Sequence, residues 1–251
     1  METISIVNRR GGVGKTATAH AIGAGLALRG YAVLFIDLDS QCNLTYDTGA
    51  HDTPPTSMEV LTGEATAKEA IQTVKRGDII PASANLAVAD TTITGTGKEY
   101  RLKEALEDLG GLYDYCIVDT PPALGVVTIN ALTASDRVII PAQAEVHSLQ
   151  GIGLLYDTIG AVQKYTNPAL KVEGILITRY NGRTILSRDM RSNLEATARE
   201  LGTKVFATPI RECIALKEAQ AVQSDIYSWA YHSNATTDYT AVLEEILEEE
   251  R

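Results

Sequence analysis

Nine residues near the N-terminus, Asn8-Arg9-Arg10-Gly11-Gly12-Val13-Gly14-Lys15-Thr16, carry the strongest pattern in this chain. They stand between an apolar run, 4–7, and a run with helical character, 17–22. A strand, a glycine-rich turn and a helix N-terminus form a cradle for phosphate, because backbone N–H groups and the helix dipole converge on the anion. Glycine suits the turn because a Cβ would hold the phosphate away. The sequence therefore predicts a nucleotide-binding loop.

The residues of this loop have distinct expected roles. Lys15 is expected to reach the β and γ phosphates, and the Thr16 hydroxyl is expected to hold Mg²⁺. An ordinary glycine turn is the alternative, but the flanking strand and helix argue against it. The full set of predicted nucleotide contacts is Gly11, Gly12, Val13, Gly14, Lys15, Thr16 and Ala17.

Two further apolar runs are each followed by carboxylates. The run 32–36 precedes Asp37-Leu38-Asp39-Ser40-Gln41-Cys42-Asn43, and the run 115–118 precedes Asp119-Thr120-Pro121-Pro122-Ala123-Leu124-Gly125. Acidic residues at the carboxyl ends of parallel strands lie where such sheets bind ligands. A single carboxylate after a strand commonly holds Mg²⁺ in nucleotide-binding proteins. A solvated turn remains the alternative for the first acidic pair.

These three segments resemble the deviant Walker A family of the ParA and MinD proteins, whose loop normally reads Lys-Gly-Gly-x-Gly-Lys-Thr. Here Arg10 stands where that family has its first lysine, and Ser40 replaces the proline of Asp-x-Asp-Pro-Gln-x-Asn. The third segment is similar to Asp-x-Pro-Pro-Ser-Leu-Gly. The resemblance runs from Thr3 to about Ala219, and the absence of an N-terminal DNA-reading extension indicates the short, Soj-like type.

The resemblance implies an Mg²⁺-dependent ATPase with ATP as its nucleotide. Lys15, Asp39 and Arg10 are the implied catalytic residues, and Asp39 would position the attacking water. Thr16, Asp37 and Asp119 are the implied metal-site residues. The family also implies a homodimer in the ATP-bound state, in which Arg10 would cross the interface to the partner's nucleotide. A ParB-like centromere-binding protein is the implied stimulating partner.

The remainder of the chain alternates between apolar runs and amphipathic stretches. This alternation predicts an α/β protein with a three-layer P-loop NTPase fold, a mostly parallel sheet and helices on both faces. With 251 residues, 45% of them hydrophobic, and no long linker, we expect a single ATPase domain over 1–251. Residues 45–56 are expected to form a surface loop. The other expected strands are 79–80, 137–140, 172–177 and 204–206, and the other expected helices are 100–109, 149–163, 188–201 and 237–248.

The net charge of −10 bears on the predicted partners. The resemblance implies DNA binding without sequence preference, which requires a local cluster of Lys and Arg. The best candidate is 178–184 with Arg188 and Arg191, in which Arg183 matches the family's DNA-contacting arginine. An ordinary basic loop with solvated arginines is the alternative.

A second DNA contact is implied for the segment 210–219. There the last arginine of the family pattern falls on Ala215, while Arg211 and Lys217 stand nearby as possible substitutes. DNA-binding residues are therefore predicted to be Arg183, Arg211 and Lys217.

The cysteines, the N-terminal residues and the acidic C-terminal residues bear on the protein's localisation and on membrane contact. Three widely spaced cysteines and the lack of a signal peptide indicate a cytoplasmic protein, and the family resemblance implies that it is nucleoid-associated. A MinD-like protein would carry a basic C-terminal helix, whereas 239–247 is acidic and the chain ends Glu248-Glu249-Glu250-Arg251, so no membrane contact is expected. A metabolic ligase or amidotransferase on the same scaffold fits the acidic motifs less well. We therefore predict an ATP-dependent dimerising switch for partitioning a plasmid, chromosome or mobile element, with a MinD-like or cargo-positioning ATPase as the alternative.

Overall fold

The computed structural model describes residues 1–248, and for residues 146 and 147 it describes the backbone alone. Seven strands form one sheet in the order β3-β4-β2-β5-β1-β6-β7. All neighbouring strands are parallel except β3 and β4, which form an antiparallel pair. The predicted mostly parallel α/β sheet is thus confirmed. The strands are β1 (Glu2–Ile6), β2 (Val33–Asp37), β3 (Gln72–Val74), β4 (Gly77–Ile80), β5 (Tyr115–Asp119), β6 (Arg137–Gln143) and β7 (Lys171–Thr178).

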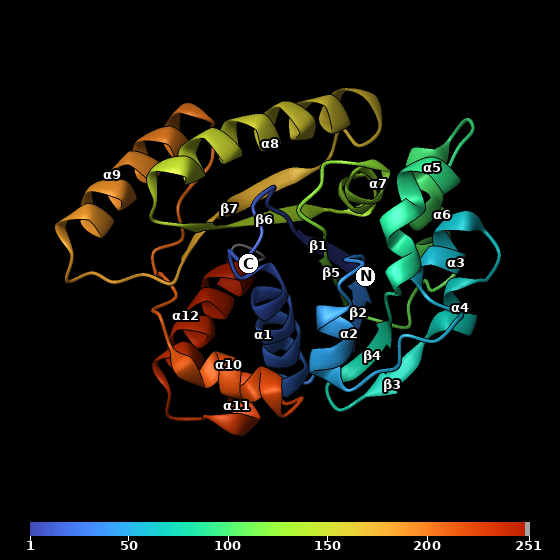
Figure 1. Cartoon of the computed structure of the whole chain (residues 1–251), viewed down its shortest axis with the longest axis horizontal. Coiled ribbons are helices and arrows are strands. Elements are labelled where there is room, and N and C mark those ends of the chain that lie inside the picture. Colours follow the sequence, from blue (N-terminus) through green and yellow to red (C-terminus); the bar gives the residue numbers. More distant parts are fainter. Residues whose placement is uncertain (249–251) are drawn as a thin grey trace.

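Helices cover both faces of the sheet and make three layers (Figure 1). Two short 3-10 turns, Ala84–Val88 and Lys98–Tyr100, accompany them. One face packs against α1 (Lys15–Leu28), α2 (Asn43–Thr48), α10 (Ile214–Ala221), α11 (Ile226–Trp229) and α12 (Asn234–Glu248). The other face packs against α3 (Ser57–Thr62), α4 (Ala67–Ala70), α5 (Ala89–Thr92), α6 (Arg101–Glu107), α7 (Val126–Ala134), α8 (Val146–Tyr165) and α9 (Ile185–Glu200).

The near-continuous apolar strands are explained by this two-sided burial. Successive side chains of a strand point to opposite faces. In β2, Val33 and Phe35 pack with α1 and α12, whereas Leu34 and Ile36 pack with α3, α6 and α7. Both sets are buried, so polar residues are tolerated only where the strands end.

Two local predictions are wrong. Residues 45–48 belong to helix α2, not to a surface loop, because the N–H and hydroxyl of Thr45 both donate to buried Asp37 and Leu44 packs into the core. The expected strand 204–206 pairs only through Val205 with Ile175, as an isolated parallel bridge beside β7. The antiparallel β3–β4 hairpin and helices α10 and α11 were not anticipated.

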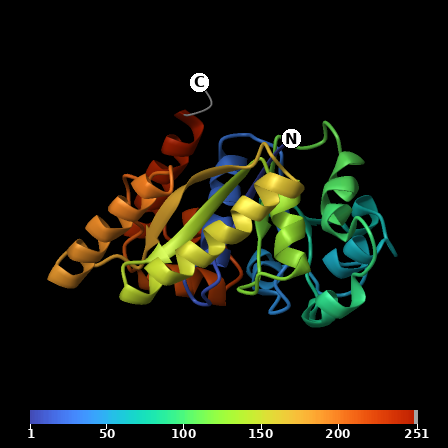
Figure 2. The same ribbon diagram turned by 90° about the horizontal axis from the view of Figure 1, so that it is seen from above.

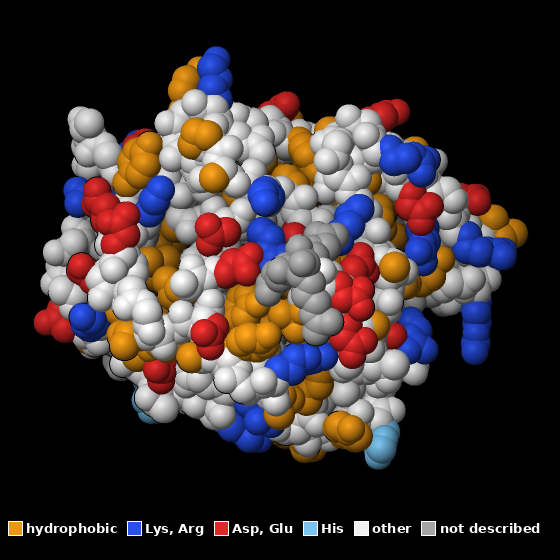
Figure 3. All heavy atoms as spheres, turned by 180° about the vertical axis from the view of Figure 1, so that it is seen from behind, with side chains coloured by type: hydrophobic (Ala, Val, Ile, Leu, Met, Phe, Trp, Pro, Cys, Tyr) orange, Lys and Arg blue, Asp and Glu red, His pale blue; other side chains and the backbone are white. Residues whose placement is uncertain are grey.

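The N-terminus and the C-terminal end of α12 lie on the same side of the molecule (Figure 2). Because β1 starts at residue 2, this is the side of the strands' amino ends, and their carboxyl ends face the viewer in Figure 1. Figure 3 shows the side of the strands' amino ends, where acidic and basic side chains are interspersed around a hydrophobic area. Residues 249–251 of the predicted acidic run lie outside the described residues. Within 1–248, no helix combines the length and hydropathy needed to cross a bilayer.

Candidate nucleotide site

The glycine-rich loop joins β1 directly to α1 at the carboxyl edge of the sheet. Helix α1 begins at Lys15, immediately after Gly14, whose φ of 89° is left-handed. Gly12 also has a positive φ of 74°, and a Cβ at this position would meet no protein atom within 4 Å. The space above the loop is therefore open, and the N-terminus of α1 is directed at it. This is the geometry in which backbone N–H groups and a helix dipole bind an anion.

Two polar side chains from neighbouring strands and one from the loop itself, Asn8, hold this loop in place. Gln143 Nε2 donates to the carbonyl of Gly12 at 3.0 Å, and Thr178 Oγ1 donates to the carbonyl of Val13 at 2.8 Å. Asn8 accepts from the backbone N–H of Arg10 at 2.9 Å. The contacts of Gln143 and Thr178 satisfy loop carbonyls from behind, and that of Asn8 satisfies a loop N–H. Sequence reasoning missed all three residues, although Gln143 and Thr178 are the polar last residues of apolar strands β6 and β7.

Lys15, Thr16 and Asp119 form the centre of the site. The buried Lys15 ammonium donates to the carbonyl of Arg10 at 3.3 Å. Burial lowers the pKa of Lys15, while Asp119 and Asp39 oppose that shift. Thr16 Oγ1 donates to Asp119 Oδ2 at 2.6 Å. The predicted grouping of these residues is thus present.

The side chains of Thr16 and Asp119 are suited to binding a divalent cation. Burial, followed by the charge of Asp37, raises the pKa of the fully buried Asp119 well above its usual range. Within residues 1–248, Asp119 Oδ1 has no hydrogen-bond donor. A buried carboxylate oxygen without a donor is costly unless a cation occupies its free position. Thr16 and Asp119 could hold Mg²⁺, which commonly takes one or two protein ligands together with phosphates and water.

Asp37 organises the acidic loop that follows β2. Its Oδ1 accepts from the N–H of Asp39 at 3.0 Å, and its Oδ2 accepts from both the N–H and the hydroxyl of Thr45 at 2.8 Å. Burial raises the pKa of Asp37 to about 6 despite these hydrogen bonds. Both oxygens already have donors, so the observed geometry shows Asp37 supporting the site from behind, while Asp39 lines its rim.

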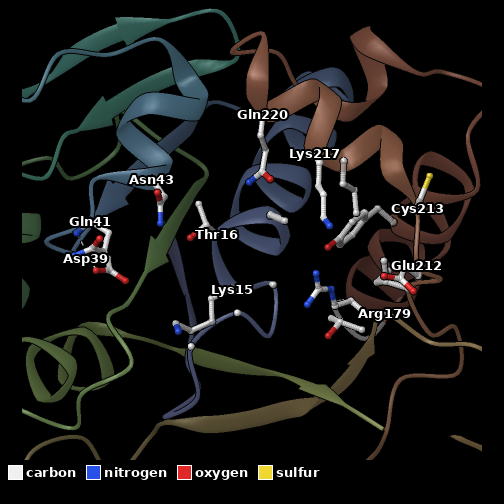
Figure 4. Close-up of a pocket in the computed structure, with 18 of the residues that line it drawn as sticks. Lys15, Thr16, Asp39, Gln41, Asn43, Arg179, Glu212, Cys213, Lys217 and Gln220 are labelled. Carbon is white, nitrogen blue, oxygen red and sulfur yellow. Dashed lines mark hydrogen bonds between the residues drawn. The ribbon is translucent and has the colours of Figure 1, made fainter. Parts of the chain in front are cut away.

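A cavity of about 460 Å³ opens beside these groups. Figure 4 shows Asp39, Gln41 and Asn43 on one side of it, with Lys15 and Thr16 between them and the opposite wall. That wall includes Arg179, Glu212, Cys213, Lys217 and Gln220. Of the predicted nucleotide contacts, Val13 does not line the cavity, and its side chain is buried.

The structure separates Arg183 from the other two predicted DNA-binding residues. Arg211 and Lys217 line the nucleotide cavity, and Arg211 forms a two-pronged ion pair with Asp238, with its shortest contact at 2.6 Å. Arg183 lies instead in the exposed loop between β7 and α9 and is not among the cavity-lining residues. The segment that follows α9 therefore returns to the cavity, which the sequence pattern did not reveal.

Arg10 is turned toward its own chain. Its Nη1 lies 2.7 Å from Oε2 of Glu145, just beyond the end of β6. Both side chains are substantially exposed, so this pair sits at the surface beside the loop.

Comparisons with known proteins agree with this geometry. A family model described as an AAA domain matches residues 1–172. The sporulation initiation inhibitor protein Soj of Bacillus subtilis is 38% identical over 248 residues, covering 97% of both chains. The chromosome partitioning protein ParA of Caulobacter vibrioides is 34% identical over 258 residues, covering 100% of this chain and 96% of its own.

A solved structure agrees in fold. The cobyrinic acid a,c-diamide synthase of Mycobacterium smegmatis, with bound ADP and magnesium, superposes with a TM-score of 0.86 at 35% identity. The match covers 98% of this chain and 94% of that one. The loop geometry and the Thr16–Asp119 hydrogen bond agree with these similarities. The chain belongs to the ParA/Soj-like family of P-loop partition ATPases.

Proposed function

We propose that this protein is an Mg²⁺-dependent ATPase whose ATP-bound form dimerises and moves DNA cargo. The observation that carries the ATPase proposal is the Thr16–Asp119 pair, with the free Oδ1 of Asp119 beside Lys15. Lys15 and the loop N–H groups would bind the β and γ phosphates. Mg²⁺, held by Thr16 and Asp119, supplies charge neutralisation when bound.

Asp39 is proposed to position the attacking water. Asp39 lies at the cavity rim, and its backbone N–H donates to Oδ1 of Asp37. Its own carboxylate is held as well, because Oδ1 accepts from the backbone N–H of Gln41 at 3.0 Å. One carboxylate oxygen is thereby oriented by the loop, which leaves the other available to a water molecule. Holding a water in line is most of what phosphoryl transfer requires of a protein.

Dimerisation is proposed to depend on Arg10. The planar guanidinium can bind a phosphate with two N–H groups, which an ammonium cannot do. In the single chain its partner is Glu145. We propose that Arg10 exchanges Glu145 for the phosphates of the partner's nucleotide when two ATP-bound chains meet, which ties the dimer to the nucleotide.

The proposed DNA contact centres on Arg183. This residue and Arg188 are exposed on the loop and helix that follow β7, and contacts to phosphate alone would explain binding without sequence preference. Arg211 and Lys217 line the nucleotide cavity, so we propose that any DNA contact they make occurs at its rim. A ParB-like protein is the proposed stimulating partner, and the site of action is the nucleoid.

A second candidate follows from the diamide synthase likeness. That protein is named for the synthesis of cobyrinic acid a,c-diamide, holds ADP and magnesium, and is 35% identical to this chain. Turnover of ATP in the absence of any small acid substrate separates the two candidates, because a partition switch hydrolyses ATP with water alone.

The direct test is phosphate release by the purified chain with ATP, with and without Mg²⁺. Thr16→Ala should lower the rate at least about tenfold, since it removes a metal ligand and the donor to Asp119. Thr91→Ala, at an exposed threonine of α5, is the matched control and should hydrolyse at the wild-type rate. Hydrolysis that persists in excess EDTA would contradict the proposal.

A further inference from the structure

A partly buried hydrogen bond connects one wall of the nucleotide cavity to helix α2, whose first residue, Asn43, lines the other side. Gln220, on α10, lines the cavity, and its Nε2 donates to Oδ2 of Asp47 at 2.8 Å. Asp47 is buried on α2, the helix that follows the acidic loop. The two residues are 173 positions apart in the chain, so only the fold brings them together.

Asp47 is held firmly enough to act as a fixed acceptor. Helix α2 is anchored at Thr45 to Asp37 by two hydrogen bonds and by the burial of Leu44 in the core. Burial raises the pKa of Asp47 to about 6, so the carboxyl is ionised at pH 8. An ionised carboxylate can only accept hydrogen bonds.

The direction of this bond decides which end of the Gln220 amide is free. A side-chain amide has one donating end and one accepting end. Because the carboxylate of Asp47 takes the NH₂ group, the carbonyl oxygen Oε1 is left as the free end. In Figure 4 that oxygen lies on the Lys217 side of the cavity and the nitrogen lies toward Asn43.

ATP offers few groups that such an acceptor could bind. Its phosphates accept hydrogen bonds and are already matched by the glycine-rich loop and Lys15. The donors of ATP are the 6-amino group of adenine and the ribose hydroxyls, all of which belong to the nucleoside half. An acceptor on the cavity wall away from Lys15 is therefore complementary to that half only.

We propose that Gln220 accepts a hydrogen bond from the nucleoside half of the nucleotide, and that Asp47 is the positioning residue that sets the orientation of its amide. The proposal rests on the proposed function, since it requires ATP or ADP in this cavity. It makes Gln220 a specificity-determining residue. It also links the helix after the acidic loop to the wall that receives the nucleoside.

The test is equilibrium binding at pH 8 with Mg²⁺, measured by calorimetry with diphosphates so that no hydrolysis occurs. The ligands are ADP, purine riboside diphosphate (which lacks only the 6-amino group), 2′-deoxy-ADP and 3′-deoxy-ADP. The wild-type protein should bind one of the three analogues roughly tenfold more weakly than ADP, and which one it is identifies the donor.

Two variants test the assignment. Gln220→Leu, similar in size but without an acceptor, should bind ADP and that analogue within about twofold of each other. The asparagine side chain in Asp47→Asn can pair with either end of the Gln220 amide. This variant should therefore reduce the ratio of the dissociation constants of that analogue and of ADP to about threefold or less. Gln150→Leu, at an exposed glutamine of α8, is the control and should keep the wild-type ratio.

The outcomes are separable. If the wild type binds all four ligands equally, or if Gln220→Leu keeps the wild-type ratio, the role of Gln220 is refuted. If Gln220→Leu loses the ratio but Asp47→Asn keeps it in full, the positioning role of Asp47 is refuted. If ADP itself does not bind, the proposed nucleotide function fails instead.

Discussion

Removing the carboxylate that holds Arg10 should strengthen the ATP-bound dimer. In Glu145→Gln the 2.7 Å ion pair is lost, so Arg10 no longer has to leave a charged partner before it crosses the interface. The side chains of Arg10 and Glu145 are 39% and 47% exposed, so solvent screens the pair and its worth is about 0.2–1 kcal/mol. A symmetric dimer breaks two such pairs, which makes the expected gain roughly 0.5–2 kcal/mol, or about 2- to 30-fold in the dimer dissociation constant.

Sedimentation equilibrium with a slowly hydrolysed ATP analogue and Mg²⁺ measures this constant. The matched control is Glu195→Gln, which removes the 2.9 Å pair with Arg191 at similar exposure but on α9. That control should dimerise as the wild type does. Arg10→Ala should remain a monomer with nucleotide bound. The reasoning is refuted if Glu145→Gln dimerises no better than the wild type, or if Arg10→Ala dimerises with normal strength.

Five further variants test the site, the DNA contact and the fold. Lys15→Ala should abolish nucleotide binding in a calorimetric titration. Asp39→Ala should bind ATP normally and release phosphate at least about tenfold more slowly than the wild type. A wild-type rate of phosphate release in Asp39→Ala would remove Asp39 from the mechanism. Arg183→Ala should weaken DNA binding on every sequence and flatten its salt dependence, as followed by fluorescence anisotropy, while leaving ATP hydrolysis unchanged; unaltered binding would exclude this loop. The folded-state pKa of Asp37 is raised to about 6, so its contribution to the free energy of unfolding is full below about pH 4 and is lost as the pH rises through about 6. Asp47, whose pKa is also raised to about 6, adds to this loss over the same window. Urea unfolding without nucleotide should therefore show a fall in the free energy of unfolding over that window, and Asp37→Asn should reduce this fall by about 3 kcal/mol. Gly23→Ala should lower the melting temperature by several degrees, since its Cβ would stand 2.1 Å from the Phe35 ring, and a melting temperature equal to the wild type would show that the ring can move aside.

The phosphate-binding loop could be predicted from sequence because its physics is local. Glycines that permit positive φ, a following helix and a lysine at its first turn are contiguous in the chain, so spacing alone determines their geometry. The meeting of Thr16 with Asp119 was predictable for a related reason. Both follow strands of one parallel sheet, and the register that pairs Ile6 with Asp119 brings their carboxyl ends to one edge.

Side-chain partners far apart in the chain were beyond sequence reasoning. Arg211 and Lys217 stay predicted DNA contacts, and nothing in the sequence indicated that the segment after α9 places both in the wall of the nucleotide cavity. Helix α2 was read as a loop because six residues carry too little helical periodicity, and contacts with Asp37 and the core stabilise it.

The sequence by itself determined the fold class, the phosphate loop and the acidic residues around it, since each depends on neighbours along the chain or on the common edge of a parallel sheet. Only the tertiary structure decided that Glu145 holds Arg10, that Gln143 and Thr178 fix the loop from behind, and that Asp47 orients Gln220. Each of these contacts joins elements more than 100 residues apart, and their pairing depends on how helices and strand ends pack in three dimensions, which no periodicity in the sequence encodes.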